Sequence, residues 1–366
     1  MTTATEEKPE PRAEKVLTRE RLYGTEARWR RFGEPTPAGR SLKDDGTVDY
    51  GVFGPGTIAW QILLHPATIV FQFSFQQKLQ LLYKPIAAGI RDKDPISRKS
   101  HEGTLTMFDL FERTQRNSGI HAPMWLGDTP TATRVAHHIH NIHNKVAGDV
   151  IDVGQPELGG YAANSPRESM WAALTEMHSM LWLYESFAFR DGQPPHPLTP
   201  EERDQFVAET AAYCRLFPHI EEELPSTLAE LEALYDTYDR FFRPSSTLAI
   251  DPETGVDMRQ LQMQNLARNH HYTQQWAIRP MTTLYMRHND AINGAFPHWV
   301  RERYLGLTPE QEEQSVQALH DKLGIIKRMQ GPKTEQHYMR LMWGPDSMGL
   351  IESARALQTE AASKAA

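Results

Sequence analysis

The chain has 366 residues, a formal net charge of −8 and one cysteine, Cys214. A chain of this length can bury a substantial core as one large or two small domains, and its acidic charge, without a basic stripe, argues against a nucleic-acid partner. One cysteine excludes a disulfide within the chain, and such cysteine usage is natural for a cytoplasmic protein.

The sequence pattern of the first part of the chain indicates neither a signal peptide nor a membrane span. Residues 1–17 are polar and rich in Pro and Glu, so we expect a disordered tail. A basic segment of helical character, 18–33, follows, and then a stretch rich in Gly and Pro through Gly56. The longest apolar stretch, 58–75, is interrupted by Gln, His and Pro, which predicts two buried helices.

Helix starts further along the chain are clearly marked. Ser165, Thr199 and Thr308 each precede a proline, and a Glu or Gln stands three positions after the hydroxyl residue. In this pattern the hydroxyl caps the free amides, proline presets φ, and the acidic or amide side chain reaches back. Thr227, with Glu230, is a weaker case without proline.

Strand signals are nearly missing from the sequence, because alternating patterns and hairpin turns are hard to find. We therefore predict an all-α protein with a single large helical domain over residues 18–357. Residues 358–366 are rich in alanine and are expected to fray.

Four histidines crowd into the two helical turns from His137 to His143. A helix from Thr129 to about Ala147 would place a wet face opposite an apolar stripe. The stripe contains Val135, Ile139, Ile142 and Val146. His140 and His143 lie along its edge, and His143 is the one whose place on an apolar face needs a reason.

A buried imidazole needs a hydrogen-bond partner or a metal, since burying it unpaired costs about 1–3 kcal/mol. An isolated histidine in such a place is more often a core residue bonded to a backbone carbonyl. Structural zinc would require further Cys or His at compact spacing, and a di-iron bundle would require paired Glu-x-x-His motifs. Haem with one axial histidine makes the fewest demands on the sequence, but periodicity alone does not choose it.

Six short motifs follow one another in a telling order. They are Phe53–Thr57 with Trp60, Asp94–Arg98, Ile142–Gly148, Tyr161–Pro166 with Trp171, Leu224–Thr227, and Phe296–Arg301. Each motif alone is weak. Together they resemble the MpaB-type oxygenases, the superfamily that includes the bacterial latex-clearing proteins (rubber oxygenases), over roughly residues 50 to 330.

The resemblance implies a globin-like helical core that binds haem b, with His143 of the central motif as the axial iron ligand. Latex-clearing proteins split a carbon–carbon double bond of polyisoprene with dioxygen, and the fungal relative cleaves a prenyl side chain. An apolar, unsaturated, isoprenoid-like small molecule is therefore the expected substrate, with dioxygen as co-substrate.

The sequence also departs from the family pattern. Lys84-Pro85 stands where the family has His-Pro, and Ala173 stands where it has a histidine. The family's Arg-x-x-x-Thr matches Arg98 to Glu102, with His101 at the position of a lysine that can cap the iron. Residues 110–127 look like an insertion.

We therefore predict a haem-dependent oxygenase with altered distal residues. Arg98 would contact a haem propionate or polarise bound oxygen, His101 or Glu102 would be the acid/base group, and His140 would contact a propionate. A peroxidase-like or hydroxylating haem enzyme, and a helical haem-binding protein without catalysis, remain alternatives. The sequence fixes neither the substrate nor the oligomeric state.

Overall fold

The computed structural model describes residues 33–269 and 288–365, and these are almost entirely helical. In the described ranges, strands occur only as two antiparallel pairs of two residues each: β1 (Ser41–Leu42) with β2 (Val48–Asp49), and β3 (Ala147–Gly148) with β4 (Tyr161–Ala162). The predicted all-α class is confirmed. The expected disordered tail, 1–17, and most of the segment 18–33 lie outside the described residues.

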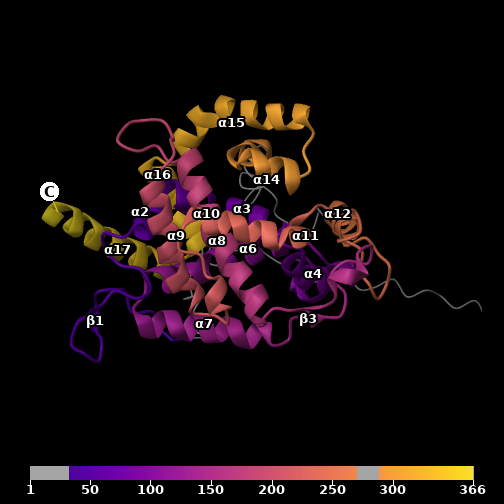
Figure 1. Ribbon diagram of the computed structural model, residues 1–366, viewed down its shortest axis with the longest axis horizontal. Coiled ribbons are helices and arrows are strands. Elements are labelled where there is room, and N and C mark those ends of the chain that lie inside the picture. Colours follow the sequence, from indigo (N-terminus) through magenta and orange to yellow (C-terminus); the bar gives the residue numbers. More distant parts are fainter. Residues whose placement is uncertain (1–32, 270–287, 366) are drawn as a thin grey trace, which may run out of the picture.

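Figure 1 shows the helices along the described chain. In the first half they are α2 (Ile58–Leu63), α3 (Pro66–Gln80), α4 (Lys84–Lys93), α5 (Pro95–His101), α6 (Met107–Leu126), α7 (Thr129–His143), the 3₁₀ turn η2 (Pro156–Leu158) and α8 (Pro166–Phe187). In the second half they are α9 (Pro200–Cys214), the 3₁₀ turn η3 (Glu221–Glu223), α10 (Leu228–Thr237), α11 (Asp239–Phe242), α12 (Met258–Arg268), α14 (His298–Arg303), α15 (Pro309–Met329), α16 (Pro332–Tyr338), the π-helical turn η5 (Met339–Trp343) and α17 (Pro345–Ala365).

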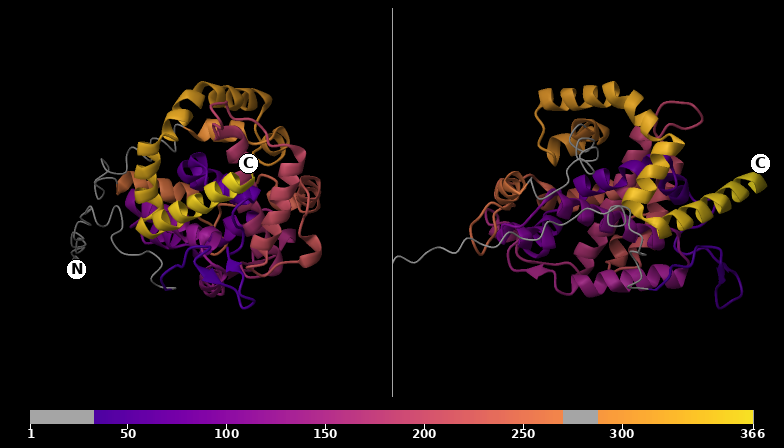
Figure 2. Two further views of the ribbon diagram at one scale, coloured as in Figure 1. Left: turned by 90° about the vertical axis from the view of Figure 1, so that its left-hand side faces the viewer. Right: turned by 180° about the vertical axis from the view of Figure 1, so that it is seen from behind.

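Helices α3 and α8 form the centre of the molecule and pack along each other. Helix α8 is buried on nearly all sides, and its aromatic residues Trp171 and Trp182 pack edge-to-face against rings from α10 and α14. Helix α9 packs on α8 and helix α6 on α3, and α7 and α17 pack in turn on α6, with α7 along the lower edge of Figure 1 and α15 across its top (Figures 1 and 2).

The apolar stretch 58–75 forms two buried helices, α2 and the first part of α3, as predicted. His65 accepts a hydrogen bond from the Ala67 amide, and Pro66 starts α3, so the two residues that interrupt the stretch make the corner between the helices. Within the described ranges, none of the helices is both long enough and apolar enough to cross a bilayer.

The marked helix starts are confirmed. Thr199 and Thr308 form full capping boxes with Glu202 and Gln311. The hydroxyls of Ser165 and Thr227 cap α8 and α10 by accepting from the third amide. At Ser165 the box stays half-formed, because the Glu168 carboxylate binds the neighbouring Arg167 guanidinium.

The histidine helix is shorter than predicted. It ends at His143, and Ala147 lies in β3. The predicted buried stripe is wrong at Ile142, which is 49% exposed. Burial falls along the helix from Val135 toward its C-terminal turn.

Two further expectations concern α6 and α17. Residues 110–126 belong to α6, a continuous helix whose face from Phe111 to Leu126 is largely buried against α7, η5 and α17, and their being an insertion relative to the family stays a prediction. The tail expected to fray, 358–366, is helical to Ala365 as the end of α17, which projects from the body in Figure 1.

Acid destabilises this fold through a buried histidine. His178 on α8 is 1% exposed, and burial lowers its pKa from an ordinary 6.5 to about 3. Between pH 6.5 and 3, His178 is therefore protonated in the unfolded chain but stays neutral in the folded chain. This histidine contributes stability above pH 6.5 that is lost as the pH falls, about 2 kcal/mol between pH 7 and pH 5. Denaturant unfolding at both pH values should show that the loss is smaller by this amount in His178→Leu; an equal loss in both proteins would contradict it.

Candidate functional site

A cavity of about 380 Å³ lies between α3, α5 and α6 and is closed by residues near the C-terminus. One side is apolar, with Phe71 and Met342 among its residues. The other side is polar without being charged. Its polar residues include Gln72, Gln77, Gln80, Thr114, Asn117 and Ser118. Such a mixture, mostly apolar with a few polar groups on one wall, is typical of small-molecule sites.

An ion pair forms one charged edge of the cavity. Asp94 caps α5 by accepting from the Ile96 amide at 2.9 Å, and its other carboxylate oxygen accepts from Arg113 Nε at 2.8 Å. The Asp94 side chain is 8% exposed and that of Arg113 is 36% exposed, so the pair is partly shielded from water. Both residues line the cavity.

His143, the last residue of α7, is half-buried. Its pKa is lowered to about 4, chiefly by burial and in smaller part by the positive charges of His140 and Arg113. Its ring is therefore neutral at pH 7 and keeps one nitrogen lone pair. No hydrogen-bond partner of this ring is found in the part of the chain that the structure describes, so the ring is not tied to a peptide oxygen there. His143 does not line the cavity, but Arg113 does, and the charge of Arg113 acts on the His143 ring.

The other predicted site residues do not gather around His143. The side chains of Arg98 and Glu102 are 72% and 52% exposed and face each other at 4.0 Å across one helical turn. His101 Nε2 lies 3.0 Å from Asp251 Oδ2, where the two residues tie α5 to the loop before α12. None of these three lines the cavity. His140 lies one turn before His143, half-buried, and its backbone carbonyl accepts from Asn164 Nδ2.

Sequence reasoning missed Arg113 and Asn117. They have the same spacing as Arg98 and Glu102, but they lie on α6 and line the cavity. They went unnoticed because residues 110–127 were taken for an insertion. The signal was present: Thr106 and Asp109 form a capping box, which marks the start of a helix that leads through both residues.

Lys84, which stands in place of the family's histidine, is 1% exposed. Its ammonium donates to the Arg240 carbonyl oxygen at 3.1 Å and to the Gln155 side chain, and burial lowers its pKa. Lys84 therefore joins α4 to α11 and η2 by direct hydrogen bonds. Ala173, at the second departure, is buried in α8 without a polar group.

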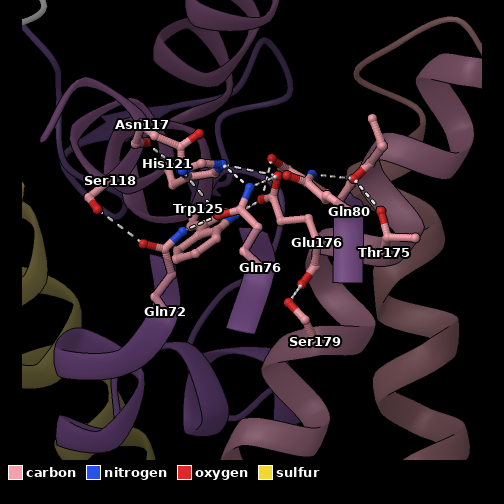
Figure 3. A network of polar contacts seen from close by, with 12 residues as sticks. Gln72, Gln76, Gln80, Asn117, Ser118, His121, Trp125, Thr175, Glu176 and Ser179 are labelled. Atoms are coloured by element: carbon pink, nitrogen blue, oxygen red, sulfur yellow. Dashed lines mark hydrogen bonds and ion pairs between the residues drawn. The ribbon is translucent and has the colours of Figure 1, made fainter. Parts of the chain in front are cut away.

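A buried polar network lies behind the polar wall (Figure 3). Its hub is Glu176 on α8, which is 5% exposed. One carboxylate oxygen accepts from Trp125 Nε1 at 3.1 Å and from the Tyr213 hydroxyl at 2.7 Å. The other lies 3.0 Å from His121 Nε2 and accepts from Gln76 Nε2 at 3.4 Å.

The donor chemistry of the site fits a haem better than a bare metal ion. Across the described ranges, no group of three or more His, Cys, Asp or Glu side chains is placed to hold a metal. A haem iron requires only one protein ligand, and the His143 ring is neutral and has a free lone pair. The Arg113 guanidinium, at the edge of the cavity, offers a cation for an acidic substituent of a haem.

The sequence pattern of the family described as ER-bound oxygenase mpaB/B′/rubber oxygenase, catalytic domain, matches residues 60–323 of this chain. The match spans α2 to α15 and includes the cavity's α3, α5 and α6 walls as well as His143. No curated protein and no solved structure is similar enough to the chain to count as a match.

Proposed function

Because the chain belongs to the oxygenase family of mpaB and the rubber oxygenases, we propose that it is a haem-dependent oxygenase. His143 would hold the iron, and the cavity beside Arg113 would hold an apolar, unsaturated small molecule of isoprenoid type. The observation that carries this proposal is the half-buried His143 ring, neutral and without a hydrogen-bond partner among the described residues, close enough to the cavity for the charge of the lining residue Arg113 to act on it.

Haem b, when bound, supplies an iron that binds and activates dioxygen. The chain's own residues do the rest. His143 would offer one ring nitrogen from the end of α7. Arg113, held by Asp94 at the edge of the cavity, keeps a positive charge that acts on the His143 ring. His140 remains a candidate for contact with a propionate, one turn earlier on the same helix.

Arg113 takes the role that the sequence first suggested for Arg98. A guanidinium has five N–H donors, and Asp94 uses the one on Nε. The others remain to bind a carboxylate or to stabilise negative charge that develops on an oxygen atom. Arg98 has a solvent-exposed side chain whose nearest ionic partner is Glu102, so it is poorly placed for either task.

The substrate would fill the apolar side of the cavity, between α3 and α6. Phe71, Leu110 and Met342 provide a surface that excludes water and suits a branched hydrocarbon chain. Exclusion of water also strengthens the field of the Arg113–Asp94 pair at the cavity edge.

Oxygen consumption tests the proposal. The haem-loaded protein is mixed with an unsaturated isoprenoid in an oxygen-electrode cell, and products are analysed after use of ¹⁸O₂. We expect uptake that depends on the isoprenoid and two carbonyl products that each carry one labelled oxygen. Turnover only with peroxide, or a labelled alcohol as the sole product, would favour the peroxidase-like or hydroxylating alternative. Haem binding without turnover would favour a haem carrier.

A further inference from the structure

Three polar side chains on α6 form one stripe along the cavity: Thr114, Asn117 and Ser118. Their spacing of three and four places them on one helix face. Each already donates a hydrogen bond inside the protein. The Thr114 hydroxyl donates to the Leu110 carbonyl oxygen at 3.0 Å, and the Ser118 hydroxyl donates to Gln72 Oε1 at 3.2 Å.

Asn117 continues this pattern. Its Nδ2 donates to Gln76 Oε1 at 3.3 Å, and Gln72 Nε2 donates to the same oxygen. Gln76 in turn directs its own Nε2 at Glu176 Oε2. The hydrogen bonds therefore run in one direction, from the cavity wall on α6 through two glutamines of α3 to one carboxylate on α8 (Figure 3).

The carboxylate and His121 fix this direction. His121 Nδ1 lies 2.6 Å from the Asn117 carbonyl oxygen and must donate to it, since a carbonyl only accepts. The other ring nitrogen, Nε2, lies 3.0 Å from Glu176 Oε2. Gln76 Nε2 lies 3.2 Å from that ring nitrogen and 3.4 Å from Glu176 Oε2, and a carboxylate oxygen accepts, so the Gln76 amide presents its NH₂ group there.

A reversed set of amides would be costly. Turning Gln76 would aim its oxygen at the Glu176–His121 pair and its NH₂ group at the NH₂ groups of Gln72 and Asn117. In a dry core such unpaired or opposed groups cost about 1–3 kcal/mol each. With their donors used inside the protein, the three side chains that line the cavity keep oxygen lone pairs to offer: Thr114 Oγ1, Ser118 Oγ and Asn117 Oδ1.

From this polarity we propose that the cavity recognises a neutral hydroxyl group on an otherwise apolar ligand. The hydroxyl donates to the α6 stripe, with Asn117 as its main acceptor. An ether or a ketone of the same shape can only accept, and so it meets lone pairs. A cationic amine is disfavoured, because the Arg113 guanidinium lies at the adjacent position of the same helix. The inference rests on the proposed function only in taking this cavity as the substrate pocket.

Binding of three matched probes tests it without any turnover. Geraniol, its methyl ether and the hydrocarbon 2,6-dimethylocta-2,6-diene share one carbon skeleton and differ in the polar end. Titration calorimetry with the full chain should give geraniol about tenfold tighter binding than either of the others, as one hydrogen bond allows. Equal affinity for geraniol and its ether, or no binding of geraniol, would overturn the inference.

Two variants and one control locate the hydroxyl recognition. Asn117→Leu keeps the volume but removes the acceptor, so geraniol should lose its advantage over the ether. The control Arg116→Gln, on the exposed side of the same helix and outside the cavity, should keep the advantage. Glu176→Gln removes the anchor of the amide chain and should reduce the advantage as well, with circular dichroism to show that it folds. If Asn117→Leu still binds geraniol about tenfold more tightly than its methyl ether, the inference is overturned.

The same titrations separate this inference from the proposed function. A tenfold preference for geraniol in a protein that consumes no oxygen would support the hydroxyl site and leave the oxygenase proposal rejected. Oxygen uptake with the hydrocarbon and equal affinities for all three probes would do the reverse.

Discussion

Replacement of His143 by alanine is expected to weaken haem binding by more than about 100-fold, because even the loss of a residue that merely supports a ligand costs 10- to 100-fold. Haem titration into the purified variant, followed by absorbance, measures this. His143 has a neutral ring that is half-buried near Arg113, and the neighbouring His140 acts on it only through its charge. Oxygen uptake should fall in parallel with haem content.

Two controls belong to this experiment. His140→Ala, one turn earlier, should keep haem binding within a few-fold of the parent protein. Imidazole added to His143→Gly should restore part of the absorbance, since the small ligand fills the place of the missing ring. Unchanged haem affinity in His143→Ala, or a greater loss in His140→Ala, would rule out His143 as the iron ligand.

Replacement of Arg113 by methionine is expected to lower kcat/KM by about 100- to 1,000-fold, the range for removing one group that stabilises developing charge. Methionine keeps much of the apolar stem and removes the cation beside the cavity and His143. Steady-state oxygen uptake at several substrate concentrations gives the value. Asp94→Asn should cost less, because it frees Arg113 without removing its charge.

The matched control is Arg98→Met. Arg98 is the arginine that the sequence motif indicated, yet its side chain is 72% exposed and away from the cavity. We expect kcat/KM to stay within about threefold of the parent protein, as for surface substitutions in general. The opposite ranking, with a large loss in Arg98→Met and a small one in Arg113→Met, would return the role to Arg98.

The helical architecture could be predicted because its signals are local. A capping hydroxyl, a proline at the first position and a returning Glu or Gln act within one turn, as at Thr199 and Thr308. The helix pair α2 and α3 could be predicted for the same reason, because His65 and Pro66 mark the corner between the two helices. Membership in the family followed from the order of short motifs, which requires no knowledge of packing.

The outer part of the site could not be predicted from local signals. The exposure of Ile142 depends on which helices lie against α7, and the sequence does not say which helix lies opposite. The choice between Arg98 and Arg113 depends on the same kind of knowledge, because both patterns have an arginine four residues before a polar group. Only the folded structure shows that Arg113 lines the cavity and that its charge acts on His143, while the Arg98 side chain is exposed.

The network around Glu176 could not be predicted from the sequence. Glu176 on α8 resembles any other helix carboxylate, and His121 lies in the segment that looks like an insertion. Their pairing joins residues 55 positions apart, and Tyr213 from α9 completes it. A buried carboxylate has to be satisfied by such partners, but the sequence does not show which groups will meet.

The most direct measurement is the absorption spectrum of the purified parent protein together with its iron content, after expression with ample haem supply. We predict a Soret band and about one iron per chain, with a pyridine haemochrome spectrum of b type. A colourless protein without iron, or iron present without a Soret band, would contradict the central claim that His143 binds a haem.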